Sequence, residues 1–247
     1  MHPAPVEGSL AQPVIRRLNT LRRLSDEGVV SLERAIREGM QHIGTGEDLI
    51  SEGDTVSSVR VILSGWLCRY KTLEDGRRQI VNFILPGETC DAYAYLLSTL
   101  DHSIATLTPV VYAEVKRAQF EALVARDRSV AEAFWCETLV NSAIQREWAI
   151  NLGRRLALER VAHLLCELHE RLRPVGLIEG NSCAFPVTQM DLADATGLSV
   201  VHLNRTLQEL RSAGLILLRE RTLTITDLDA LKSTALFSPN YLYLYRA

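Results

Sequence analysis

Hydrophobic and polar positions divide the chain into a helical start, a strand-rich middle and a helical end. Two short amphipathic helices are predicted between residues 11 and 40, with Ser25 and Ser31 as candidate caps. From residue 42 to 115 the apolar residues form short runs (VRVIL, WLCRYK, QIVNFIL) between glycines at positions 53, 65, 76 and 87. Short strands with regularly spaced turns are typical of an antiparallel sandwich, jelly roll or barrel.

A long helix is predicted next, over residues 128–151. Small and apolar side chains recur along it at alternating spacings of three and four residues, interrupted by the charged Glu147. This stripe predicts either a seam between two copies of the chain or packing against the chain's own β-domain. A second helix follows over residues 154–173, with Gly153 as a hinge. The residues expected on a dimer face are Cys136, Val140, Ala143, Ile144 and Ile150.

The segment PVTQMDLADATGLSVVHLNRTLQELRSAGLI has the pattern of two short helices joined by a tight turn. Thr188 and Ser199 are suited to cap helices over residues 189–196 and 200–212, and Gly197 can adopt the positive φ of the turn between them. The following LILLRERTLTI predicts a β-hairpin with Arg219 and Arg221 at its tip. For the helices alone any helical hairpin is the alternative, but the hairpin after them favours a winged helix-turn-helix.

Leucines at positions 203, 207 and 210 mark the inner face of the second helix. At about 100° per residue, the opposite face carries Val201, Arg205 and Gln208. An arginine there is suited to guanine O6 and N7 or to a phosphate, and a valine to a thymine methyl group; a solvated surface charge is the alternative for Arg205. The residues expected to contact DNA are Thr188, Gln189, Ser199, Val200, Val201, His202, Asn204, Arg205, Gln208, Arg219 and Arg221.

Composition narrows the class of protein. A hydrophobic share of 47% and a charged share of 23% suit a packed globular chain, and no window approaches eighteen consecutive apolar residues. The N-terminus lacks the basic and apolar regions of a signal peptide, so a cytoplasmic location away from the membrane is expected. The net charge of −3 provides no global basic signature, and DNA binding must therefore depend on a local patch.

Enzymatic and metal chemistry are not predicted. The chain contains no GxSxG, P-loop, HExxH or GxGxxG motif. Its five cysteines are an odd number without CxxC spacing, which argues against a disulfide framework or a zinc ribbon. We therefore expect no resident metal and name no cofactor.

The order of these segments resembles the Crp–Fnr family of bacterial regulators, in the stretches ISEGD, LSGWLCRY, EDGRRQIVNFILPGE and the helix-turn-helix. The resemblance implies an α+β fold with an N-terminal antiparallel β-roll or jelly roll like a cyclic-nucleotide-binding domain, a long dimerisation helix and a C-terminal winged helix-turn-helix. It also implies a homodimer that binds a palindromic site on double-stranded DNA and activates transcription with RNA polymerase as a partner. The implied segments are 1–40 (tail and short helices), 41–127 (β-roll), 128–153 (dimerisation helix and hinge), 154–235 (winged helix-turn-helix) and 236–247 (C-terminal tail).

The chain departs from the family pattern in its roll. Members that bind cyclic AMP carry a Glu and an Arg-Ser pair, where this chain has Ala92 and His102-Ser103. A phosphate site without that arginine loses its bidentate partner, so cyclic AMP binding is not expected. The roll is expected to sense another signal and to reorient the winged helices through the long helix. Haem held by His102 or Cys90, oxidation of Cys183, and control by abundance alone remain as alternatives. The absence of cysteines before Cys68 argues against an Fnr-like iron–sulfur centre. The candidate effector pocket comprises Cys90, Asp91, Tyr93, His102 and Ser103.

The second helix of the helix-turn-helix also departs from the family pattern. Many members place Arg and Glu after the capping Ser, where this chain has Val200 and Val201. Arg205 matches the family's downstream Arg. The DNA site is therefore expected to differ from the usual family half-site.

Overall fold

The computed structural model describes residues 10–244. The first part of the predicted N-terminal tail (1–9) and the end of the predicted C-terminal tail (245–247) lie outside the described residues. The described residues form two compact units, one of residues 10–69 and 83–141 and one of residues 70–82 and 142–244. The long helix α4 (Arg128–Arg154) contributes to both units.

Two amphipathic helices begin the first unit, as predicted. They are α1 (Gln12–Leu21) and α2 (Asp26–Glu38), and each buries one apolar face. Ser25 caps α2, because its hydroxyl accepts a hydrogen bond from the amide of Gly28 at 2.9 Å. The prediction of a cap at Ser31 was wrong, because Ser31 lies inside α2, where amides bond to earlier carbonyls and leave a cap no role.

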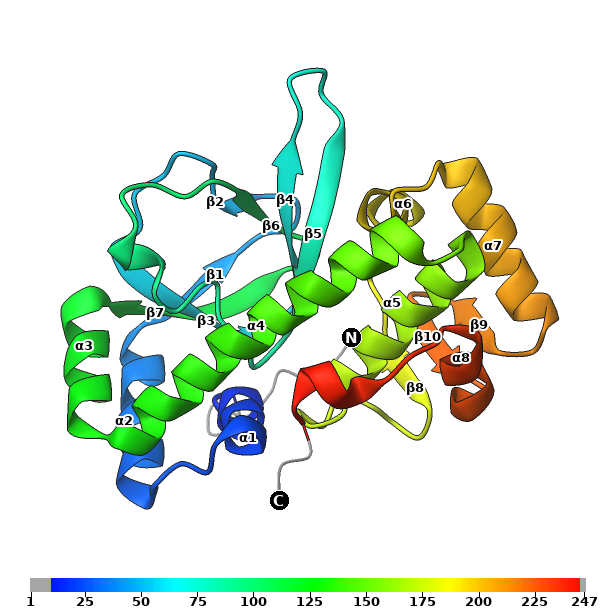
Figure 1. Ribbon diagram of the computed structural model, residues 1–247. Coiled ribbons are helices and arrows are strands. Elements are labelled where there is room, and N and C mark those ends of the chain that lie inside the picture. Colours follow the sequence, from blue (N-terminus) through cyan, green and yellow to red (C-terminus); the bar gives the residue numbers. More distant parts are fainter. Residues whose placement is uncertain (1–9, 245–247) are drawn as a thin grey trace. The chain divides into compact units, whose positions relative to one another are not determined.

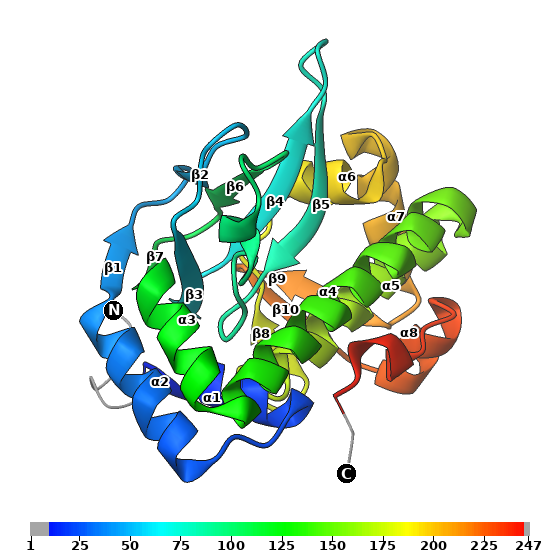
Figure 2. The same ribbon diagram turned by 60° about the vertical axis from the view of Figure 1, so that its left-hand side comes forward.

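Among the described residues, seven strands form the antiparallel roll, and residues 70–82 of its β4–β5 hairpin are grouped with the second unit. One sheet has the order β1-β7-β3 and the other the order β2-β6-β4-β5. The predicted turn at Asp75-Gly76 joins β4 to β5, and Gly76 there has a φ of +85°. Strands β4 and β5 are the two arms of this hairpin (Figure 2). The strands are β1 (Met40–Ile43), β2 (Asp48–Ile50), β3 (Ser58–Ser64), β4 (Leu67–Thr72), β5 (Arg78–Ile84), β6 (Ser103–Thr106) and β7 (Val110–Lys116).

Successive side chains of β3 and β7 point to opposite faces of their sheet and belong to two different apolar clusters. Val59, Val61 and Leu63 face the helices, whereas Ile62 faces the inside of the roll. The helix-facing cluster includes residues of α1, α2, α3 (Arg117–Arg126) and the N-terminal half of α4, which lie together in Figure 1. The roll interior is filled by aliphatic side chains from strands of both sheets: Ile50, Ile62, Leu67, Ile84, Ile104 and Val110.

The second unit contains the predicted helix after α4 and the predicted winged helix-turn-helix. Helix α5 (Ala157–Leu172) contacts α6 (Gln189–Thr196), α7 (Val200–Ser212) and α8 (Leu228–Thr234), which surround it in both views (Figures 1 and 2). Helix α4 continues through Gly153, the residue predicted as a hinge, and the helical path breaks at Arg155 and Leu156.

A three-stranded antiparallel sheet completes the second unit, in the order β8-β10-β9. The strands are β8 (Ser182–Ala184), β9 (Ile216–Arg219) and β10 (Thr222–Ile225). The chain then runs through α8 to a short 3₁₀ helix, η2 (Pro239–Leu242), which packs on α5. The predicted α+β class with an antiparallel roll, a long helix and a winged helix-turn-helix is confirmed. Across residues 10–244, no helix combines the length and hydropathy needed to cross a membrane.

Candidate nucleic-acid interface

Local sequence rules produce the first helix of the helix-turn-helix. The Thr188 hydroxyl accepts a hydrogen bond from the Asp191 amide at 3.1 Å, and an Asp191 carboxylate oxygen accepts one from the Thr188 amide at 3.1 Å. Gly197 ends α6 in the left-handed region with a φ of +64°, which a residue with a side chain adopts at a cost. The capping box and the tight turn are therefore both present at the predicted residues.

An arginine that the sequence did not single out binds the acidic residues of α6. Arg78 of β5 donates to Asp191 at 2.6 Å and to Asp194 at 2.8 Å, within the second unit. The single positive charge of Arg78 offsets part of the negative charge on this helix, which is expected to approach DNA. Arg78 is separated from Asp191 by more than a hundred residues, so no local pattern could have revealed the contact.

The second helix, α7, begins as predicted at Ser199, whose hydroxyl accepts a hydrogen bond from the His202 amide at 3.2 Å. Its inner face is completely buried through Leu203, Leu207 and Leu210. Its outer face is open to solvent, and Val201 there is 73% exposed. An exposed apolar side chain beside the cationic Arg205 suits contact with base edges.

The predicted contact residues therefore lie on a single accessible module. Of the eleven residues, Val200 is half-buried and the others are exposed: Thr188, Gln189, Ser199, Val201, His202, Asn204, Arg205, Gln208, Arg219 and Arg221.

The wing has a strained turn. Arg219 pairs with Thr222, so Glu220 and Arg221 form a two-residue hairpin loop, with φ values of +49° and +59°. Such loops favour Asn and Gly, because both central residues must adopt positive φ. The Phe185 amide donates to the Arg221 carbonyl at 2.6 Å and holds the turn from the side of β8. The third strand, β8, was missed in the sequence because it has only three residues.

Cys183 lies in β8 and is 5% exposed. Burial raises the pKa of its thiol to about 11, which disfavours the thiolate that oxidation requires.

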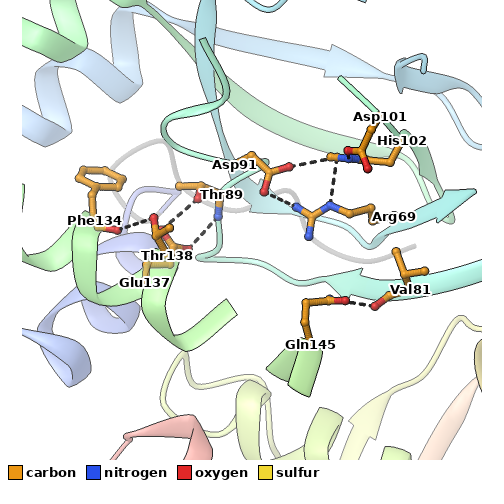
Figure 3. Close-up of polar contacts among 10 residues, drawn as sticks. All are labelled: Arg69, Val81, Thr89, Asp91, Asp101, His102, Phe134, Glu137, Thr138 and Gln145. Atoms are coloured by element: carbon orange, nitrogen blue, oxygen red, sulfur yellow. Dashed lines mark hydrogen bonds and ion pairs between the residues drawn. The ribbon is translucent and has the colours of Figure 1, made fainter. Parts of the chain in front are cut away.

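The candidate effector residues of the roll lie in different surroundings. Asp91 and His102 meet, and both contact Arg69 of β4 (Figure 3). The Cys90 thiol lies in the apolar interior, and burial raises its pKa to about 12. The Ser103 hydroxyl accepts a hydrogen bond from the Glu52 amide at 2.9 Å. Tyr93 packs away from that interior, with its ring 5.7 Å from that of Phe120.

Arg69 was missed in the sequence, yet it organises the polar group of the roll. Its guanidinium donates to Asp91 at 2.7 Å, and its Nε lies 3.2 Å from His102 Nε2. Burial raises the pKa of Asp91, but the charge of Arg69 and the bond to His102 outweigh it, so the net pKa is lowered. The Asp91 carboxylate thus pairs with the buried Arg69 guanidinium.

Most residues of the predicted dimer face on α4 are buried inside the chain rather than exposed for a partner. Val140, Ala143 and Ile144 are buried within the chain itself, and Cys136 is half-buried. Only Ile150 of the predicted set is exposed, at 49%. At the centre of the stripe, the alternative of packing within the chain therefore applies. The exposed large apolar residues of α4 are instead Trp135, Leu139 and Ile150.

Within residues 10–244, no cluster of three or more His, Cys, Asp and Glu side chains has the arrangement of a metal site.

Two family models match the chain. One describes a cyclic nucleotide-binding domain and matches residues 40–127, and the other describes a Crp-like helix-turn-helix domain and matches residues 159–234.

Known regulators are similar over most of their length. The chain is 30% identical over 191 residues to the nitrogen fixation regulation protein FixK of Rhizobium meliloti, covering 76% of this chain and 83% of that protein. It is 27% identical over 225 residues to the transcriptional activator protein FnrL of Cereibacter sphaeroides, covering 90% and 89%. The solved structure of FixK2 from Bradyrhizobium japonicum matches with a TM-score of 0.71 at 25% identity, covering 81% and 98%. These relatives are regulators rather than enzymes, in agreement with the prediction for this chain.

Proposed function

Because the chain belongs to the Crp–Fnr family of transcription regulators, we propose that it binds a specific, roughly palindromic site on double-stranded DNA as a homodimer and activates transcription. The observation that carries this proposal is the outer face of α7, where Val201 and Arg205 are exposed beside a completely buried leucine face. Recognition helices of this motif read base edges with residues near their N-terminus.

Each exposed residue has a role that follows from its chemistry. Arg205 reads a guanine through O6 and N7, and Val201 contacts a thymine methyl group. His202, Asn204 and Gln208 hydrogen-bond base edges or phosphates, and half-buried Val200 adds apolar contact. Thr188, Gln189 and Ser199 lie at helix N-termini, where free amides favour phosphate. Arg219 and Arg221 extend the phosphate contacts from the wing.

We assign the dimer seam to the exposed apolar stripe of α4. Trp135 and Leu139 are four residues apart and are 58% and 67% exposed, and Ile150 lies three turns further along. An exposed apolar row of this kind on a long helix favours association with a second copy. Twofold symmetry then places the two recognition helices about one helical turn of DNA apart, which makes the site palindromic.

We propose that the roll needs no cyclic nucleotide. Support comes from its aliphatic interior and from the pairing of Arg69 with Asp91, which leaves an incoming phosphate no free arginine at this point. The regulator then acts in the cytoplasm with RNA polymerase as its partner and is controlled by its own abundance. A haem or thiol sensor is less favoured, since Cys90 and Cys183 are both buried as neutral thiols.

One experiment tests the proposal. Purified protein in reducing buffer selects its site from random duplexes, and fluorescence anisotropy then measures Kd for that site with and without cyclic AMP. We expect nanomolar specific binding that cyclic AMP leaves unchanged. Arg205→Gln should weaken binding at least tenfold and relax the preference at one base pair. Equal affinity for the selected and random duplexes would overturn the proposal.

A further inference from the structure

A hollow separates the C-terminal half of α7 from the wing strand β9. It has a volume of about 520 Å³. Its walls are formed by Gln208, Arg211, Ser212, Leu217, Leu218 and Arg219. The sequence predicted DNA contacts for Gln208 and Arg219 but not for Arg211. The hollow therefore adds the positive charge of Arg211 to the proposed interface.

The hollow lies at the end of the DNA-facing row of α7. At about 100° per residue, Gln208 and Ser212 continue the row that begins with Val201 and Arg205. Arg211 lies on the side of this row that borders β9, since both line the same hollow. At 1.5 Å per residue it is about 15 Å further along the axis than Val201. That distance separates it from the bases read by the start of the helix.

Neither arginine of the hollow pairs with a carboxylate among residues 10–244. Arg211 and Arg219 form no ion pair with any residue from 10 to 244, whereas Arg78, Arg155 and Arg171 each bind a carboxylate. The acidic residues nearest in sequence are Glu209 and Glu220. Neither lines the hollow, since Glu209 is on the opposite flank of α7 and Glu220 is in the hairpin loop.

We propose that Arg211 and Arg219 together bind one DNA phosphate over this hollow, outside the segment whose bases are read. The proposal rests on the DNA-binding function proposed above and adds Arg211 to its contacts. Two guanidinium groups on opposite walls suit the oxygens of one phosphate, and the open polar walls leave room for the DNA backbone. Such a contact strengthens binding to every sequence equally and carries no base preference.

The test measures Kd by anisotropy over a range of KCl concentrations, on the site selected by the wild-type protein. We expect Arg211→Gln to raise Kd roughly five- to tenfold at low salt and to reduce the slope of log Kd against log salt by about 0.9, the value for one phosphate. Arg211→Lys should keep most of the slope, because it keeps the charge. Arg34→Gln, which removes an exposed charge from α2 in the other unit, should change neither quantity.

The double variant separates a shared phosphate from two separate ones. If both arginines are required to hold the same phosphate, removing either one releases it. Arg211→Gln/Arg219→Gln then reduces the slope by about as much as either single change, rather than by twice that amount. A wild-type slope for Arg211→Gln, or a changed base preference in site selection, would overturn the inference while leaving the proposed function in place. Absence of specific binding by the wild-type protein would overturn both.

Discussion

Glu137 of α4 accepts two hydrogen bonds from Thr89 of the roll, one from the amide at 2.9 Å and one from the hydroxyl at 3.0 Å (Figure 3). Burial raises the pKa of Glu137 to about 7, although the charge of Arg17 opposes the change. Two residues after Thr89, Asp91 binds Arg69 and His102. The short segment between them therefore joins the polar group of the roll to the long helix.

The raised pKa of Glu137 predicts a pH-dependent stability. The unfolded carboxyl titrates near 4.5 and the folded one near 7, so between these values the folded state holds the extra proton. The stabilisation is fully present below pH 4.5 and is lost as the pH rises to 7. Glu137→Gln cannot titrate. Its free energy of unfolding should therefore fall less steeply over this window, by up to about 1.4 kcal/mol per pH unit.

Urea unfolding at pH 5, 6, 7 and 8 measures this difference. Glu74→Gln, which removes an exposed carboxylate in the β4–β5 turn, is the control and should follow the wild-type pH profile. Parallel profiles for Glu137→Gln and the wild type would show that Glu137 does not titrate in this range.

The wing turn predicts a gain in stability. Glu220 has a φ of +49°, and glycine adopts such a φ without steric cost. Glu220→Gly should raise the free energy of unfolding by about 1 kcal/mol. Arg221, at +59°, provides a matched variant: Arg221→Gly should stabilise similarly but weaken DNA binding, because it removes a positive charge. Thermal unfolding and anisotropy distinguish the two effects, and destabilisation by Glu220→Gly would contradict the strain argument.

The α4 stripe predicts how the dimer can be broken. Leu139 is 67% exposed, and a glutamate there would bury a charge in the proposed seam. Sedimentation of Leu139→Glu should give the chain mass of 27.6 kDa, against twice that value for the wild type. Leu97→Glu makes the same change at a residue of the roll that is 59% exposed, and it should remain dimeric. A dimeric Leu139→Glu would place the seam elsewhere.

The C-terminal segment predicts a further stability effect. The Tyr241 hydroxyl of η2 donates to the buried Glu167 carboxylate at 2.7 Å, beside Trp148, which donates at 3.0 Å. Tyr241→Phe removes one hydrogen-bond partner from a buried carboxyl group and should cost about 1–3 kcal/mol in urea unfolding. Tyr95→Phe is the comparison, since the Tyr95 ring packs in the core of the first unit. A cost for Tyr241→Phe no larger than for Tyr95→Phe would show that the bond adds no stability.

Local rules explain why the helix-turn-helix was predicted to the residue. Caps at Thr188 and Ser199 and the positive φ of Gly197 depend on neighbours within a few positions, so the bounds of α6 and α7 agree with the prediction. Ser31 shows the limit of such rules. A serine can cap a helix in principle, but α2 had already begun at Asp26.

By itself, the sequence determined the order of the segments, the α+β class and the exposed face of α7, because these follow from spacing and short-range backbone chemistry. Only the tertiary structure decided which side of α4 faces inward. That helix carries apolar residues on more than one side. In the folded chain Val140 and Ile144 are buried, whereas Trp135 and Leu139 are exposed. The pairings of Arg69 with Asp91 and of Arg78 with Asp191 were likewise beyond the sequence. Each joins charges that are distant along the chain, and only packing brings them within reach.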